Sequence, residues 1–207
     1  MLLLFLISGT LFSEQVAISQ PDKRTHACFN GKNPICEDLL ILKPGFGPGE
    51  ALRLSNVFHK VSRRYRLNPR LMVAIAFQES SLTLEAVRQV RGISLEENSS
   101  NDLITVGSDF CMMQINAGNI SRLGLDAKKL LTDAEYCIEA GARILRDFQK
   151  KYGDLERNWW SRYNSCTPTY REMYEKLVSA HWKKLFPVRE STTCADNPRP
   201  DMNASDL

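Results

Sequence analysis

The chain has 207 residues, of which 43% are hydrophobic and 25% charged, as in one globular domain with short tails. Its 27 basic and 24 acidic residues give a net charge of +3 and a pI near 8.5. Proteins that track nucleic-acid phosphates concentrate their Lys and Arg in runs or patches, and the sequence has no long basic run. Nucleic acid is therefore not expected as a partner.

The first residues predict a signal peptide at 1–19. An apolar run begins at Met1 and reaches Phe12, and Ala17-Ile18-Ser19 supplies a small-x-small cleavage site. The run lacks the usual preceding Lys or Arg, and it is shorter than the ~20 apolar residues that span a bilayer. We therefore expect a secreted or periplasmic protein with no stable membrane span after cleavage.

An even number of cysteines in an exported chain favours disulfides over metal ligands. The six are Cys28, Cys36, Cys111, Cys137, Cys166 and Cys194. Spacing does not fix their pairing, and we expect at least two disulfides, with Cys137 joined to Cys28 or Cys36. The three histidines are scattered along the chain, so no metal site and no cofactor is predicted.

Residues 20–50 are rich in proline and glycine, which predicts an irregular lead-in to a single domain at 51–187. Apolar residues at helical spacing predict helices at 50–65, 70–80, 133–152 and 168–186, so the fold class is mainly α. Asn68-Pro69 supplies an N-cap followed by proline for the second of these helices. The polar stretch 85–107 predicts an exposed loop or small hairpin, and 188–207 a flexible tail.

One carboxylate continues an apolar helix face. Leu71, Ile75 and Glu79 are spaced by four residues and share that face, with Glu79 near the helix C-terminus. Burial and the helix dipole both favour the protonated acid there, as a general acid requires. A glutamate turned to solvent at a helix end is the alternative.

Two later segments add polar and aromatic groups suited to sugars, Cys111-Met112-Met113-Gln114-Ile115-Asn116 and Trp159-Trp160-Ser161-Arg162-Tyr163-Asn164-Ser165. Together with Ala76-Phe77-Gln78-Glu79-Ser80-Ser81-Leu82, their order resembles the lytic transglycosylases of the soluble-lytic-transglycosylase type, which have a lysozyme-like fold. The resemblance is greatest to the small enzymes that accompany type III and type IV secretion and conjugation systems. It covers roughly residues 50–186.

The resemblance implies Glu79 as the catalytic acid/base and peptidoglycan glycan strands as the substrate. The substrate-binding residues it implies are Ser80, Met113, Gln114, Asn116, Tyr163 and Asn164. Two features depart from the family pattern. Cys111 stands where the family has glycine, which is suited to a positive φ or a close approach. The stretch between Ser81 and Asp109 is long and lacks the usual proline, so the family's groove serine is not placed.

The reaction implied by this resemblance uses one carboxyl group. Glu79 protonates the β-1,4 glycosidic oxygen beyond N-acetylmuramic acid and then deprotonates its C6 hydroxyl, which closes a 1,6-anhydro ring. The alternatives are a hydrolytic muramidase, whose second carboxylate would be Asp102, Asp109 or Glu85, and a non-catalytic wall-binding assembly factor. Secretion or conjugation proteins are possible partners.

Overall fold

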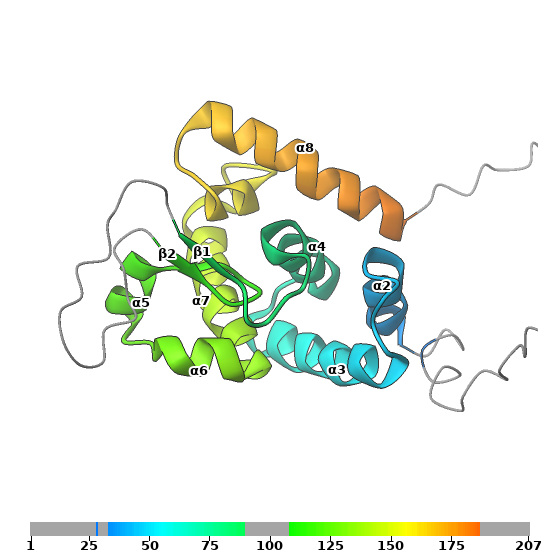
Figure 1. Ribbon diagram of the computed structural model, residues 1–207. Helices are drawn as coiled ribbons and strands as arrows, with labels where there is room; N and C mark the ends of the chain where they lie inside the picture. Colours follow the sequence, from blue (N-terminus) through cyan, green and yellow to red (C-terminus); the bar gives the residue numbers. More distant parts are fainter. Residues whose placement is uncertain (1–27, 29–32, 90–107, 187–207) are drawn as a thin grey trace, which may run out of the picture.

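The computed structural model describes residues 28, 33–89 and 108–186 of the chain (Figure 1). The predicted signal peptide, the tail 188–207 and Asp102 lie outside these residues. The described part is mainly helical with one small sheet, which confirms the predicted fold class. Within it, no helix is long and apolar enough to cross a membrane, and no cluster of metal-binding side chains occurs.

The helices and strands follow one another in a simple order. The first four elements are α2 (Pro34–Leu42), α3 (Pro48–Tyr65), α4 (Pro69–Ser80) and β1 (Val87–Gln89). After the gap in the described residues come β2 (Ser108–Phe110), β3 (Ile115–Asn116), α5 (Ala117–Leu123) and α6 (Ala127–Thr132). The last three are α7 (Ala134–Tyr152), the 3₁₀ helix η1 (Trp159–Tyr163) and α8 (Pro168–Leu185).

The four helices predicted from sequence are confirmed as α3, α4, α7 and α8, each within two residues of its expected ends. The side chain of Asn68 accepts hydrogen bonds from the backbone N–H groups of Arg70 and Leu71 at 2.9 and 3.4 Å. Pro69 follows at the first helical position, where its missing N–H costs nothing. These signals place Glu79 one residue before the end of α4.

The expectation of an irregular lead-in at 20–50 is wrong for its second half. Residues 34–42 form α2, capped by Asn33, whose side chain accepts from the N–H of Cys36. Ile35 and Leu39 are buried one turn apart and pack α2 against α3 and α4. Pro34 stands at the start of a helix instead of interrupting one, so α2 belongs to the core of the domain.

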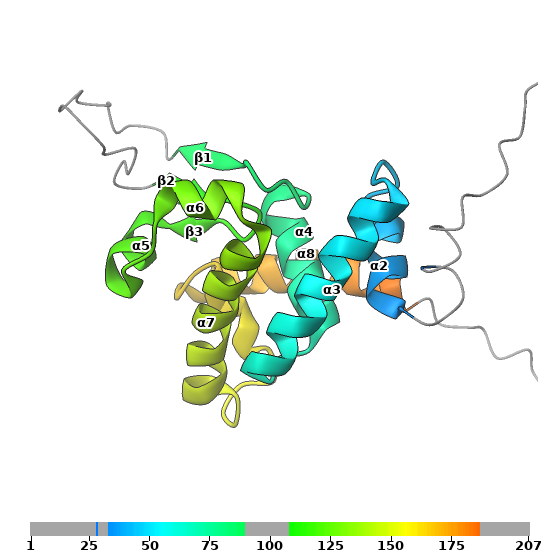
Figure 2. The same ribbon diagram turned by 90° about the horizontal axis from the view of Figure 1, so that it is seen from below.

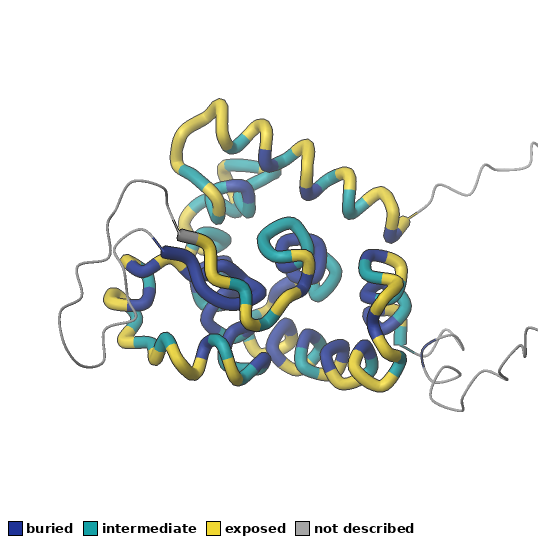
Figure 3. The backbone as a smooth tube through the Cα atoms, in the orientation of Figure 1, coloured by how far each residue is buried: buried dark blue, intermediate teal, exposed yellow. Residues whose placement is uncertain are grey.

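Helix α4 lies in the middle of the molecule, with α2, α3 and α8 around it (Figures 1 and 2). Its residues 72–76 are buried without exception, and Figure 3 shows the buried backbone concentrated there and in the neighbouring strands. A helix enclosed on several sides is rigid, because its side chains are close-packed against several neighbours at once. Glu79 therefore lies on a rigid helix.

The sheet has the strand order β1-β2-β3, and both pairings are antiparallel. Val87 pairs with Phe110 in the first ladder, and Phe110 pairs with Ile115 in the second. The strands β1 and β2 thus pair at the two ends of the stretch predicted as a polar loop or small hairpin. Residues 90–107 between them lie outside the described part. The sheet brings Arg88 and Asp109 beside the end of α4.

Two disulfides form in the described residues, Cys28–Cys36 and Cys111–Cys137. The expectation of at least two is confirmed, but the preferred partner of Cys137 is wrong. Cys28 and Cys36 close a local loop at the start of α2, whereas Cys137 on α7 faces the turn after β2. The second disulfide therefore ties the 111–116 segment to the longest helix of the domain.

Candidate active site

Glu79 is the most buried carboxylate beside the sheet, with only 5% of its side chain exposed. The hydroxyl of Tyr174, on α8, donates a 2.6 Å hydrogen bond to Glu79 Oε1. Tyr174 is itself buried, so this phenol has one fixed partner. The carboxyl group is thus held in one orientation by two helices that are far apart in sequence.

Burial raises the pKa of Glu79 above its ordinary value of 4.5. The Tyr174 hydrogen bond and the Arg88 charge oppose this increase in the pKa of Glu79, and the Asp109 charge adds to it. Desolvation is the largest of these effects, because moving the charged form out of water costs more than the partners return. A carboxyl group so placed retains its proton to higher pH and can act as a general acid.

Arg88 on β1 connects Glu79 to a second carboxylate. Its Nε and Nη2 donate to Asp109 Oδ2 at 3.0 and 2.8 Å, and Nη2 lies 3.9 Å from Glu79 Oε2. The two carboxyl oxygens are therefore at most about 7 Å apart, since the same nitrogen reaches both. Asp109 Oδ1 also accepts from the side chain of Asn116 at 3.1 Å, so both oxygens of Asp109 are occupied.

The segment 111–116 forms a tight turn followed by β3. Cys111 and Gln114 both have positive φ, 63° and 48°, a region that residues other than glycine seldom adopt. The N–H of Gln114 donates to the Cys111 carbonyl at 2.9 Å and closes the turn. The Cys111–Cys137 disulfide holds this strained turn against α7.

Met113 and Gln114, two of the implied substrate-binding residues, have buried side chains. Met113 is completely buried and packs on Gly141 of α7, where an added Cβ would lie 2.5 Å from Met113 Cε. The Gln114 side chain donates to the carbonyls of Cys111 and Ala86 at 2.9 and 3.3 Å. Both side chains position the turn and leave its backbone to face the site.

Tyr163 and Ser80 bind the backbone of the same turn. The Tyr163 hydroxyl donates to the Met113 carbonyl at 2.7 Å, and the Ser80 hydroxyl donates to the Met112 carbonyl at 2.9 Å. Burial, and then the charge of Glu79, raise the pKa of Tyr163 well above its ordinary value of 10. Ser80 acts here on protein backbone.

The two asparagines lie at the edge of the site. Asn116 caps α5 by accepting from the Gly118 N–H at 2.8 Å, while its amide holds Asp109. Asn164 follows η1 and is exposed. The structure thus brings Glu79, Ser80 and Tyr163 together around the turn, with Asn116 one step away through Asp109.

The sequence profile of the transglycosylase SLT domain matches residues 56–177, more than half of the chain. The chain belongs to the transglycosylase SLT domain family. Its relatives include the invasion protein IagB of Salmonella typhimurium, 29% identical over 135 residues that make up 61% of this chain and 74% of that protein. IagB of Salmonella typhi is 27% identical over 146 residues, or 68% and 81% of the two chains. No solved structure matches the chain significantly.

Membership of the SLT family makes the Cys111 position informative. A positive φ there explains why glycine suits it, and the disulfide to Cys137 stabilises the same conformation with a residue that has a side chain. The departure from the family pattern therefore keeps the geometry of the turn. An SLT domain acts on peptidoglycan, which is the coarse activity that this membership gives the chain.

Two residues that contact Glu79 were not predicted as site residues from the sequence. Tyr174 lies within the helix predicted at 168–186, and Arg88 lies in a polar stretch with no motif. A tyrosine at a core position must satisfy its hydroxyl, which was a usable signal for Tyr174. Nothing local indicated Arg88, because its role depends on the sheet register that sets it opposite Asp109.

Proposed function

We propose that this protein is a peptidoglycan lytic transglycosylase that uses Glu79 as its single acid/base. The bond cleaved is the β-1,4 linkage between N-acetylmuramic acid and N-acetylglucosamine, and the product carries a 1,6-anhydro end. The observation that carries the proposal is the nearly complete burial of the Glu79 carboxyl group, held by Tyr174 at the end of a rigid helix. This arrangement supplies a proton first and accepts one afterwards.

The protonated form of Glu79 starts the reaction by donating to the glycosidic oxygen. The carboxylate that results is stabilised by the Tyr174 hydroxyl and by the nearby Arg88, two groups that lower the pKa of Glu79 once charge develops. The oxygen of the C2 acetamide attacks C1 as the bond to the leaving sugar breaks. The carboxylate then takes the proton of the C6 hydroxyl, whose oxygen displaces the acetamide oxygen at C1. The proton count balances, and no water enters.

Asp109 gives a hydrolytic muramidase specific support as a second candidate. An oxygen of Asp109 lies at most about 7 Å from an oxygen of Glu79, which is compatible with the spacing of paired carboxylates in glycosidases, about 5–9.5 Å. Against this role, Arg88 neutralises its charge and Asn116 occupies its second oxygen. A nucleophile or base needs a free lone pair aimed at substrate or water, so we assign Asp109 to orienting Arg88.

The products separate the two candidates. Purified sacculi are digested with the protein, and the released muropeptides are analysed by mass spectrometry with and without borohydride reduction. A lytic transglycosylase releases fragments lighter by one water than the hydrolytic products, and these resist borohydride because they have no reducing end. Reducing ends in most fragments would establish the muramidase.

An Asp109→Asn variant sharpens this comparison. The asparagine keeps the shape of the side chain and one acceptor for Arg88 but cannot act as nucleophile or base. If the protein is a lytic transglycosylase, Asp109→Asn should still cleave the glycan, and its products should still carry 1,6-anhydro ends. Loss of cleavage to the level of Glu79→Gln would make Asp109 the second catalytic carboxylate.

We place this activity outside the cytoplasm and, in view of the name of the Salmonella relatives, near a secretion or invasion apparatus. The support is the apolar N-terminal segment with its small-x-small site, the disulfides at Cys36 and Cys137, and the similarity to the invasion protein IagB. Fractionation of cells that express the full chain, with N-terminal sequencing of the exported form, tests the location. Recovery of the uncleaved chain in the cytoplasm alone would contradict it.

A further inference from the structure

Five of the eight residues that line a second pocket are basic, and Glu79 is not among the eight. The pocket has a volume of about 390 Å³ and lies between the end of α3, the end of α5 and one face of α7. Its basic side chains are Arg64, Arg66, Arg143, Arg146 and Lys150. Asp147 is the single carboxylate among its lining residues. None of these residues takes part in the site described above.

Several of these cations are not neutralised by the protein. Arg64 donates to Glu139 at 2.8 Å, and Arg146 reaches only the neutral side chain of Gln149. No hydrogen bond or ion pair connects the side chains of Arg66, Arg143 and Lys150 with any described residue. Asp147 lies 3.6 Å from a cation outside the pocket, Arg122. The pocket therefore keeps an excess of about three positive charges.

Charge pairing along α7 accounts for only part of its cations. Arg143 has Glu139 four residues before it and Asp147 four residues after it, a spacing at which opposite charges attract. Arg146 and Lys150 also stand four residues apart, and there like charges repel each other. Basic residues in the last turn of a helix interact favourably with its dipole, but this effect is confined to that turn, and Arg143 lies near the middle of α7. A bound anion would remove the repulsion.

We propose that this pocket binds a phosphate-bearing ligand, as a phosphate ester or pyrophosphate group. A carboxylate carries one charge, whereas a phosphate group carries nearly two and offers three oxygens to converging donors. Guanidinium groups match these oxygens with paired N–H donors, and Arg66, Arg143 and Arg146 supply three of them. The volume exceeds that of a phosphate ion and lies in the lower range of small-molecule sites, about 300–1,000 Å³.

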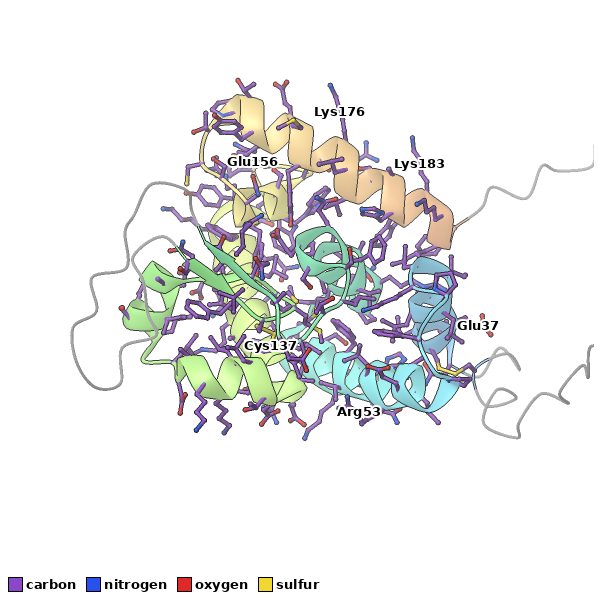
Figure 4. The ribbon with its side chains drawn as sticks, in the orientation of Figure 1. Glu37, Arg53, Cys137, Glu156, Lys176 and Lys183 are labelled. Atoms are coloured by element: carbon purple, nitrogen blue, oxygen red, sulfur yellow. A yellow bond between two sulfur atoms is a disulfide. The ribbon has the colours of Figure 1, made fainter. Side chains whose placement is uncertain are left out.

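Calorimetric titration of the full chain with sodium pyrophosphate at low ionic strength tests the proposal. The variant Arg143→Gln/Arg146→Gln is expected to bind at least about tenfold more weakly, because it loses two charge-assisted hydrogen-bond donors. The control Lys176→Gln/Lys183→Gln removes the same charge from α8, where Figure 4 shows both side chains extending away from the molecule. The control is expected to bind like the unchanged protein.

The variant Arg66→Gly tests whether weaker binding comes from the loss of a cation and not from a loss of stability. Arg66 has a φ of 55°, so glycine relieves backbone strain there while it removes a pocket cation. Its melting temperature is expected to be unchanged or higher, and its affinity for pyrophosphate lower. Unchanged affinity in both pocket variants would overturn the proposal, as would an equal loss in the α8 control.

Three further titrants identify the source of the phosphate. Binding of glucose 1-phosphate but not of vesicles indicates a soluble phosphate ester, and binding of phosphatidylglycerol vesicles that pyrophosphate displaces indicates a lipid headgroup. Either result supports the site. Citrate binding as tightly as pyrophosphate, or no binding of any phosphate probe, contradicts it. These readouts do not involve glycan cleavage, so they stand or fall independently of the proposed function.

Discussion

Replacing Tyr174 with phenylalanine removes the hydroxyl that binds the carboxyl group of Glu79, the proposed acid/base, and changes little else. The hydroxyl donates a 2.6 Å hydrogen bond to Glu79 Oε1, and both groups are buried. A hydrogen bond to a charged group is worth about 1.5–3 kcal/mol. The hydrogen bond lowers the pKa of Glu79, so that pKa should rise further in Tyr174→Phe.

The direction of this change in the pKa of Glu79 gives a specific pH profile. The reaction begins from the protonated acid, so activity is lost as pH rises through the pKa of Glu79. In Tyr174→Phe this basic limb should move to higher pH, while the maximal rate falls because the developing carboxylate has lost a donor. Initial rates of turbidity loss with purified sacculi across a pH series measure both effects.

Tyr170→Phe is the matched control, since Tyr170 lies on the same helix and is exposed. Its pH profile should be that of the unchanged protein. A basic limb at the same pH in Tyr174→Phe and the control would refute the coupling of Tyr174 to Glu79. A shift to lower pH would show that the hydroxyl stabilises the protonated acid instead.

Three stability predictions follow from other contacts. Cys111→Gly/Cys137→Ala loses a crosslink across 26 residues but relieves a positive φ, so denaturant unfolding should show a net loss of about 2–3 kcal/mol. Gly141→Ala should lose about 1–3 kcal/mol in the same assay, because its Cβ overlaps a buried methionine, and an unchanged midpoint would contradict that packing. Arg70→Gln leaves Asp38, whose pKa burial raises to about 6, without its 2.7 Å partner. Native Asp38 holds its proton more tightly than the unfolded chain does, so stability falls as pH rises from about 4 to 6. The loss in Arg70→Gln should therefore be about 3 kcal/mol near pH 8 and smaller near pH 5, and an equal loss at both would contradict it.

The sequence predicted those helices whose ends carry local signals. Asn68 and Pro69 mark the start of α4, and the apolar spacing of α7 defines its buried face. Proline led to a wrong prediction where nearby residues did not show that a helix begins at it. Pro34 and Pro48 open helices α2 and α3, yet in a stretch rich in proline and glycine they suggested irregular chain.

The site was predicted in part because its motifs are contiguous. The resemblance implied Glu79 and Tyr163 as site residues, and in the structure the charge of Glu79 acts on the Tyr163 phenol. The burial of Met113 against Gly141 could not be predicted, since it depends on how α7 crosses the turn. The partners of Glu79 come from β1 and α8, and only tertiary packing decides such contacts.

The most direct test of the central claim is the rate at which Glu79→Gln releases muropeptides from sacculi. The amide keeps the shape of the side chain but cannot donate and retake a proton, so cleavage should fall about 10²–10⁴-fold. Its melting temperature should not fall, because a buried ionisable group is replaced by a neutral one. Glu85→Gln, an exposed glutamate close in sequence, should retain full activity. Cleavage by Glu79→Gln within about tenfold of the unchanged protein would contradict the assignment of Glu79 as the acid/base.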